Sequence, residues 1–286
     1  MRLLMELWIG ASGYSYPDWV GGFYPDGTRP NRMLAYYARC FPIVELNFTF
    51  YRPPTPEMLG KIAAQTPAGF QFLVKLPQSI SHEHSPRDLD GFRRAVLELQ
   101  RLGRLSGLLC QLPQSAHEDR PLRTWVETVG RALGDLSLAV EFRHRSWAGA
   151  ETAAWMADLG LALVAVDVPD LSGLYPRGWV QSGPTAYVRM HSRDKAKWYR
   201  GEKQRYDYLY DDAALTEWLD AAAAAAGQGA AERALFLFNN CHRSQAAINA
   251  QRLQNLASGR SEFAVQPPPA ESGTAQRSLF DDAPPE

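Results

Sequence analysis

Eight short apolar segments, each ending in polar or small residues, constrain the fold of this chain more than any other feature. They are the predicted strands 5–11, 43–49, 71–77, 107–112, 137–142, 161–167, 185–191 and 234–239. Side chains alternate between the two faces of a strand, so Glu45 and Asn47 share one face while Val44 and Leu46 share the other. In seven of the eight strands the end residues share one face in this way. Packing gives no reason for charges at the ends of buried strands, whereas a (β/α)8 barrel enzyme builds its active site there.

Helical segments separate these strands. The predicted helices are residues 31–41, 87–103, 119–133, 150–159, 211–226 and 244–257. Regular alternation of strand and helix with short connections predicts a parallel sheet, and eight repeats predict that the sheet closes. We therefore expect a (β/α)8 TIM-like barrel over residues 1–260 and a C-terminal tail over 261–286. From residue 266 onward the tail has five prolines and no apolar periodicity, which predicts disorder.

Composition excludes several classes of protein. The 286 residues carry a net charge of -1, so a large basic face is not predicted and any contact with nucleic acid would be local. Cys40, Cys110 and Cys241 are far apart and odd in number, which indicates neither a disulfide framework nor a zinc motif. No apolar run approaches the length needed to span a membrane, and the first residues do not resemble a signal peptide. We expect a cytoplasmic protein with no membrane association.

The polar strand ends of a closed barrel lie around one opening, so their side chains should converge there. The candidates for acid–base chemistry are Glu45, Glu141, Asp167 and His191. The candidates for substrate binding are Asn47, Lys75, Gln111, Arg143, Arg189, Asn239 and Asn240. We expect a glutamate to act as general base and His191 as general acid. Guanidinium groups match phosphate and carboxylate bidentately, so Arg143 and Arg189 predict an anionic, phosphate-bearing substrate.

Two alternatives remain for the same residues. Glu45, Glu141, Asp167 and His191 suit one or two divalent metals (Mg, Mn or Zn), although the nearby cations compete for the carboxylates. The residues also suit an ion-pair network that closes the top of the barrel. The cost of burying so many charges argues against this structural role, because apolar packing is often at least as stable.

A long connection follows the seventh strand. Residues 192–210 (SRDKAKWYRGEKQRYDYLY) are rich in Lys, Arg, Tyr and Trp. Long loops after barrel strands are often lids or binding loops, so we expect Trp198 and Tyr199 to contact the substrate. The alternative is a solvated loop whose aromatic side chains pack on the barrel rim.

Seven motifs in order resemble those of the YecE-like domain-of-unknown-function family, the one numbered 72. They are IGASGYSYPDW (9–19), VELNFTFYRPP (44–54), FLVKLPQSISHE (72–83), LLCQLP (108–113), AVEFRHRSW (139–147), YVRMHSR (187–193) and FNNCHRSQAAINA (238–250). The resemblance implies a TIM-like barrel but no established reaction. The matching polar positions include His82 and Asn249 besides the candidates above. Phe48 and Ser244 depart from the pattern, since we would expect a small hydroxyl residue and a glycine there.

The tail carries a short motif. Gln276-Arg277-Ser278-Leu279-Phe280 resembles the pentapeptide with which bacterial proteins bind the DNA polymerase sliding clamp. We expect Leu279 and Phe280 to enter an apolar pocket of the clamp while Gln276 forms hydrogen bonds at its rim. The alternatives are a chance match and a tail that folds back onto its own barrel.

Three functions fit these features. The leading hypothesis is a hydrolase or nuclease-like phosphodiesterase that acts on a phosphate-bearing substrate and is tethered to the sliding clamp. The second is an isomerase or lyase acting on a sugar-phosphate-like small molecule. The third is a non-catalytic module that binds the clamp or nucleic acid. Barrels of this class host many chemistries, so the fold does not choose among them.

Overall fold

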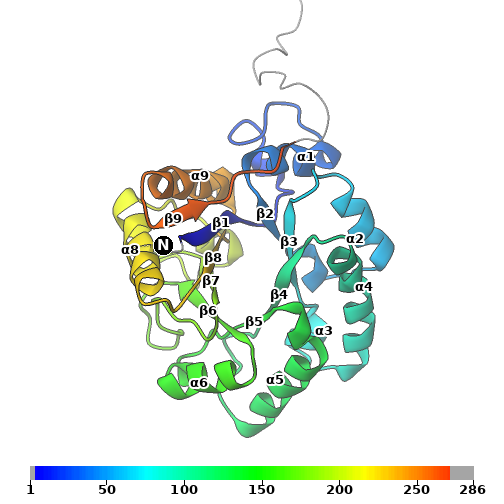
Figure 1. The fold of residues 1–286 in the computed structure, drawn as a ribbon, viewed down its shortest axis with the longest axis vertical. Helices are drawn as coiled ribbons and strands as arrows, with labels where there is room; N and C mark the ends of the chain where they lie inside the picture. The colour runs from blue at the N-terminus through cyan, green and yellow to red at the C-terminus, as the bar shows by residue number, and fades with distance from the viewer. Residues whose placement is uncertain (1–3, 271–286) are drawn as a thin grey trace, which may run out of the picture.

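The strands form a closed parallel barrel in the computed structural model, which describes residues 4–270 except the side chain of Glu202. All eight predicted strands are present: β1 (Met5–Ser12), β2 (Ile43–Leu46), β3 (Gln71–Lys75), β4 (Leu105–Gln111), β5 (Leu138–Glu141), β6 (Ala162–Asp167), β7 (Thr185–Met190) and β8 (Arg233–Phe238). They pair in chain order, and β1 pairs with both β8 and β2, so the sheet closes on itself. Figure 1 looks into this ring of strands, with the helices around it.

The helices cover the outside of the barrel. They are α1 (Pro30–Cys40), α2 (Pro56–Ala63), α4 (Leu89–Arg101), α5 (Arg120–Leu133), α6 (Ala150–Asp158), α8 (Asp212–Gly227) and α9 (Gln245–Ser258), with short helices α3 (Gln78–Ser81) and α7 (Glu202–Arg205) in the loops after β3 and β7. Helix α2 was not among the helices predicted from the sequence. It begins at a proline and is capped by the Thr55 hydroxyl, which accepts from the Met58 amide at 3.2 Å. Residues 168–184, between β6 and β7, form no helix. Within residues 4–270, no helix is both long and apolar enough to cross a membrane.

A short ninth strand extends the ordered part of the chain beyond the predicted domain boundary at residue 260. Strand β9 (Phe263–Val265) pairs in parallel with Met5–Leu7 at the start of β1. Strand β2 pairs with β1 only at Ala11 and Ser12, so the first residues of β1 leave an edge that β9 occupies. Figure 1 shows β9 beside β1 at the rim of the barrel. An unpaired edge is a liability in a sheet, and covering it gives residues 263–265 a structural role.

Candidate functional site

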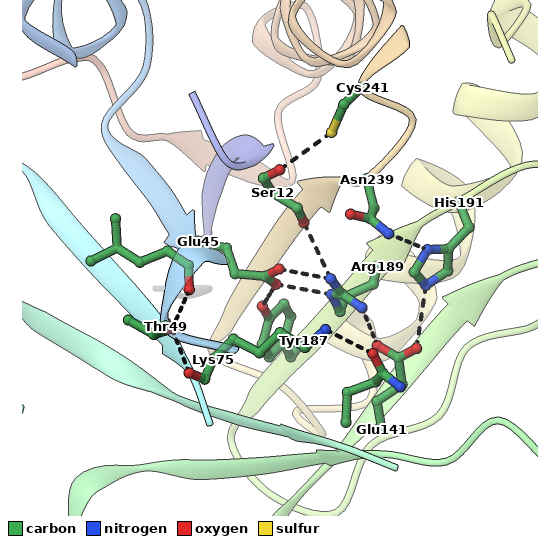
Figure 2. Close-up of polar contacts among 12 residues, drawn as sticks. Ser12, Glu45, Thr49, Lys75, Glu141, Tyr187, Arg189, His191, Asn239 and Cys241 are labelled. Carbon is green, nitrogen blue, oxygen red and sulfur yellow. Dashed lines mark hydrogen bonds and ion pairs between the residues drawn. The ribbon is translucent and has the colours of Figure 1, made fainter. Parts of the chain in front are cut away.

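Arg189 on β7 is the centre of a buried ion-pair network inside the barrel (Figure 2). Its Nε and Nη2 donate to the two carboxylate oxygens of Glu45 on β2, at 2.9 and 2.7 Å. Its Nη1 donates to Oε2 of Glu141 on β5 at 2.5 Å. The Tyr187 hydroxyl also donates to Glu45. All four side chains are buried. Strand alternation brings them together, as the sequence predicts for Glu45, Glu141 and Arg189.

The charges of this network stabilise one another. Burial by itself raises the pKa of Glu141, but the adjacent guanidinium groups of Arg143 and Arg189 outweigh it and hold that pKa well below its usual value. Burial by itself lowers the pKa of Arg189, but Glu141 and Glu45 raise it well above its usual value. Glu141 is therefore ionised, and guanidinium donors occupy both Glu141 and Glu45. The structural alternative predicts this arrangement, which suits a general base poorly.

His191 continues the network as a neutral group. Its Nε2 lies 3.4 Å from Oε1 of Glu141, and its Nδ1 is 3.0 Å from Nδ2 of Asn239. Burial and then Arg143 lower the pKa of His191 to about 3, although Glu141 opposes them. The imidazole is thus neutral near pH 7 and lacks the second, acidic proton of an imidazolium, which argues against the general-acid role expected from the sequence.

Asp167 lies on the other side of the barrel wall, so its predicted place in the site is wrong. In the register of β6 and β7, Val166 aligns with the inward Arg189, whereas Asp167 aligns with the outward Met190. The Asp167 carboxylate accepts from Arg193 at 2.7 and 2.9 Å and from Nε1 of Trp218 on α8 at 2.5 Å. It therefore fastens the start of the loop after β7 to a helix.

A cavity of about 240 Å³ opens at the carboxyl end of the barrel. It is lined by Phe50, Tyr51, Lys75, His82, Gln111, Pro113, Gln114, Arg143, Leu174, Trp198, Arg205 and Tyr206. Three of these residues carry a positive charge and none is a carboxylic acid, so the lining of the cavity is cationic. The two network glutamates do not line it.

The cationic side chains that line the cavity have N–H groups that donate to no protein acceptor among the described side chains. Arg143 forms an ion pair with Glu141 through Nε, and Arg205 donates its Nε to the Trp198 carbonyl at 2.8 Å. Among the described side chains, which leave out that of Glu202, no protein acceptor contacts the terminal nitrogens of either guanidinium. Lys75 donates from Nζ to Oε1 of Gln111 at 2.8 Å (Figure 2) and lies 4.4 Å from the Phe50 ring centroid.

Two groups lining the cavity have altered acidity. Burial, the largest effect, lowers the pKa of Lys75 to about 8, and Arg189 acts in the same direction against Glu45 and Glu141. Burial and then Lys75 lower the pKa of His82 to about 4. His82 therefore stands neutral beside an amine that titrates near neutral pH.

Of the two residues that the sequence singled out in the loop after β7, Trp198 lines the cavity and Tyr199 does not. Trp198 is 1% exposed and lines the cavity, with the Arg205 guanidinium 5.2 Å from its ring centroid. Tyr199 is 60% exposed and does not line it, and its hydroxyl accepts from Gln114 at 2.9 Å. Lys197 and Asp207 pair at 2.9 Å within the loop.

Three asparagines from the predicted site differ in their roles. Asn239 contacts His191 as described, at the top of β8. Asn240 donates to the Tyr208 carbonyl and so anchors the end of the loop after β7. Asn47 follows the end of β2 with helical backbone angles (φ -96°, ψ -21°), so strand alternation no longer sets its direction. Its Oδ1 is buried without a hydrogen-bond partner in the described part of the chain.

The residues present do not fit the predicted divalent-metal site. Asp167 points away from the barrel interior, and the oxygens of Glu45 accept from Arg189 and Tyr187. The described residues contain no group of three or more His, Cys, Asp or Glu side chains placed to hold a metal ion. A metal at this position would compete with a guanidinium already bound to both glutamates.

Several residues of the network and the cavity were absent from the sequence-based site, with Arg205, Tyr206, His82 and Tyr187 among them. Arg205 and Tyr206 lie in the loop that composition singled out, but no periodicity identifies which of its side chains turn inward. His82 lies in the motif after β3, on the loop that contains α3. Tyr187 could have been found, because it stands two residues before Arg189 and therefore shares its face.

A second cavity of about 570 Å³ adjoins the first at His82 and Pro113. Its lining includes His84, His117 and Trp125, and contains no Lys or Arg. The His84 and Trp125 rings lie 5.7 Å apart between centroids. The two cavities together offer a cationic part and an aromatic part.

The geometry defines a TIM-like barrel with a cationic cavity at the carboxyl ends of its strands. The chain belongs to the family described as protein of unknown function DUF72, whose model matches residues 8–273. UPF0759 protein YunF of Bacillus subtilis is 27% identical over 270 residues, which cover 87% of this chain and 94% of YunF. UPF0759 protein YecE of Escherichia coli K12 is 31% identical over 140 residues, or 48% of each chain.

Solved structures agree on the fold. A crystal structure of a DUF72 family protein from Thermotoga maritima has a TM-score of 0.81 and 33% identity, and the match covers 88% of this chain and 99% of that one. SacUVDE has a TM-score of 0.52 and 11% identity over 89% of this chain and 98% of its own, which shows likeness of fold alone.

Proposed function

We propose that the protein is an enzyme that binds a small phosphate-bearing substrate in the cationic cavity at the barrel mouth. One observation carries the proposal: Lys75, Arg143 and Arg205, from three separate segments, line one cavity whose lining contains no carboxylate. The terminal nitrogens of both arginines have no acceptor among the side chains that the structure describes, which leave out that of Glu202. Guanidinium and ammonium groups are the usual protein partners of phosphate oxygens, and charge-assisted bonds of this kind are the strong ones.

The size of the cavity favours a small substrate over a nucleic-acid strand. Its volume of about 240 Å³ lies below the ~300 Å³ at which pockets for drug-sized ligands begin. The second of the three functions expected from the sequence, an isomerase or lyase acting on a sugar-phosphate-like molecule, fits this size best.

The adjoining cavity favours a second candidate, a phosphodiester or nucleotide substrate. Bases stack on aromatic side chains, and Trp125 and His84 would offer such faces beside the cations. Titration with adenosine monophosphate separates the candidates. Binding at least tenfold tighter than that of glycerol 3-phosphate, lost in Trp125→Ala, supports the nucleotide. Equal or weaker binding favours the small substrate.

Arg205→Gln is expected to weaken the binding of glycerol 3-phosphate by about tenfold or more, because one charge-assisted hydrogen bond contributes about 1.5–3 kcal/mol. Arg205 is the best choice since, unlike Arg143, it has no buried carboxylate partner. Isothermal titration calorimetry at low salt measures the dissociation constant. Glycerol, which lacks the phosphate, is expected not to bind.

Arg200→Gln is the matched control, because Arg200 is an exposed residue of the same loop and does not line the cavity. It removes the same charge and should leave the dissociation constant within about twofold, as expected for an exposed charge in a screened position. Equal losses in Arg200→Gln and Arg205→Gln would contradict a defined site and indicate general attraction by the loop.

We also propose that the tail binds the bacterial sliding clamp and so locates the enzyme at DNA. The residues of the motif, Gln276, Leu279 and Phe280, lie outside the described residues. The support for this proposal is therefore the sequence motif alone. Surface plasmon resonance with the immobilised clamp tests it. The full chain should bind and Leu279→Ala/Phe280→Ala should not, because the two apolar side chains supply the contact that enters the pocket. Equal binding by both proteins would contradict the proposal.

A further inference from the structure

Lys75 has a fixed position at the end of a strand, and its side chain lines the cavity. It stands at the end of β3, and the Thr49 hydroxyl donates to its backbone carbonyl at 2.6 Å, which fixes the base of the side chain (Figure 2). The protein has five lysines, and the other four are Lys61, Lys195, Lys197 and Lys203. Lys75 alone among them lines the cavity.

The surroundings of its amine favour the uncharged form. Among the described side chains of residues 4–270, which leave out that of Glu202, the only hydrogen-bond acceptor of Nζ is the neutral Oε1 of Gln111, at 2.8 Å, and no carboxylate forms an ion pair with it. Gln111 donates its Nε2 to the Leu112 carbonyl at 2.8 Å, which turns its oxygen toward Lys75. A neutral acceptor stabilises the ammonium less than a carboxylate does. Nearby cations disfavour a further positive charge.

We propose that Lys75 is a nucleophile that forms an imine with the carbonyl carbon of a phosphorylated aldehyde or ketone. The inference rests on the proposed function, because the phosphate group would be held by Arg143 and Arg205 in the same cavity. Desolvated lysines beside other cations are known to act in this way. The proposal assigns both a substrate class, a phosphorylated carbonyl compound, and a covalent role.

The step balances without an oxidant or reductant. The Nζ lone pair forms a bond to the carbonyl carbon while the carbon–oxygen π electrons move to oxygen. Both amine protons then leave with that oxygen as water, and the carbon–nitrogen double bond remains. The pKa of Lys75, lowered to about 8, provides the uncharged amine. On the order of 10% of it is uncharged at pH 7, roughly two-hundredfold more than for an ordinary lysine.

Borohydride trapping tests the proposal in the full chain. The protein is incubated at pH 7 with glyceraldehyde 3-phosphate, the imine is reduced with sodium borohydride, and peptide mass spectrometry locates the secondary amine. Lys75 should be labelled at least tenfold faster than any of the other four lysines, which serve as internal controls. Inorganic phosphate should compete, and glyceraldehyde should label Lys75 at least tenfold more slowly than its phosphate ester.

Lys75→Arg keeps the positive charge but cannot form an imine, so it should bind glycerol 3-phosphate and show no preferred label. If this variant does not fold, competition by inorganic phosphate in the unaltered protein decides the question. Normal binding of glycerol 3-phosphate with no preference for Lys75 overturns the imine and leaves the proposed function standing. Absence of binding, or equal labelling by glyceraldehyde and its phosphate ester, overturns the phosphate site on which both proposals rest.

Discussion

Replacing Arg189 with methionine should lower the free energy of unfolding by about 3–5 kcal/mol, the usual cost of removing one partner from a buried ion pair. Methionine replaces only the aliphatic part of the arginine side chain and removes the guanidinium donors that Glu45 and Glu141 have at 2.5–2.9 Å. Both carboxylates are 0% exposed, so water cannot replace the lost bonds. The measurement is urea unfolding followed by tryptophan fluorescence.

Arg260→Met is the control for this prediction. Arg260 pairs with Asp220 at 2.6 Å on the surface, where 63% of the Asp220 side chain is exposed. Exposed pairs of this kind contribute up to about 1 kcal/mol. The combined variant Arg189→Met/Glu45→Gln/Glu141→Gln should recover part of the loss, since it also removes the two buried carboxylate charges with which Arg189 pairs. A cost for Arg189→Met no larger than that of Arg260→Met would show that the network does not form.

Acid should destabilise the protein through His191. The folded protein keeps this side chain neutral down to a pKa of about 3, whereas in the unfolded chain it takes up a proton near pH 6.5. The unfolded state therefore binds one more proton between these values. The stability from a neutral His191 is fully present above about pH 6.5 and is lost as the pH falls, at up to about 1.4 kcal/mol per pH unit.

His191→Gln isolates this effect, because glutamine can still form a hydrogen bond with Asn239 but cannot take up a proton. Between pH 6.5 and 5 the free energy of unfolding of the unaltered protein should fall more steeply than that of the variant, by about 1.4 kcal/mol per pH unit. His82 titrates in both proteins, so its contribution cancels in the comparison. Above pH 7 the two curves should run parallel. Parallel curves down to pH 5 would mean that His191 is protonated in the folded state.

The sequence predicted the barrel because alternation and strand count are local signals that survive in the fold. Glu141 with Arg143, and Arg189 with His191, form pairs two residues apart, so each pair identifies its own inward face. Strand β6 offers only Asp167, and a single polar residue cannot show which face is inward. The register with β7 settles the direction, and register is not visible in one sequence.

The cavity residues that the sequence missed come from outside the barrel strands. Arg205 and His82 reach the cavity from α7 and from the residue after α3, where no periodicity governs side-chain direction. Ser244, where a glycine was expected, adopts left-handed angles (φ 65°) that glycine tolerates best. The expected glycine thus marked a real backbone constraint, which this chain meets with a serine.

Anomalous diffraction from a crystal soaked in tungstate, a tetrahedral oxyanion that mimics phosphate, tests whether the cavity binds an oxyanion through its cations. We expect a tungsten peak inside the cavity, with oxygens within hydrogen-bond distance of the Arg143 and Arg205 terminal nitrogens. We also expect glycerol 3-phosphate to displace the peak. An unoccupied cavity beside tungsten bound elsewhere on the protein would contradict the proposed function.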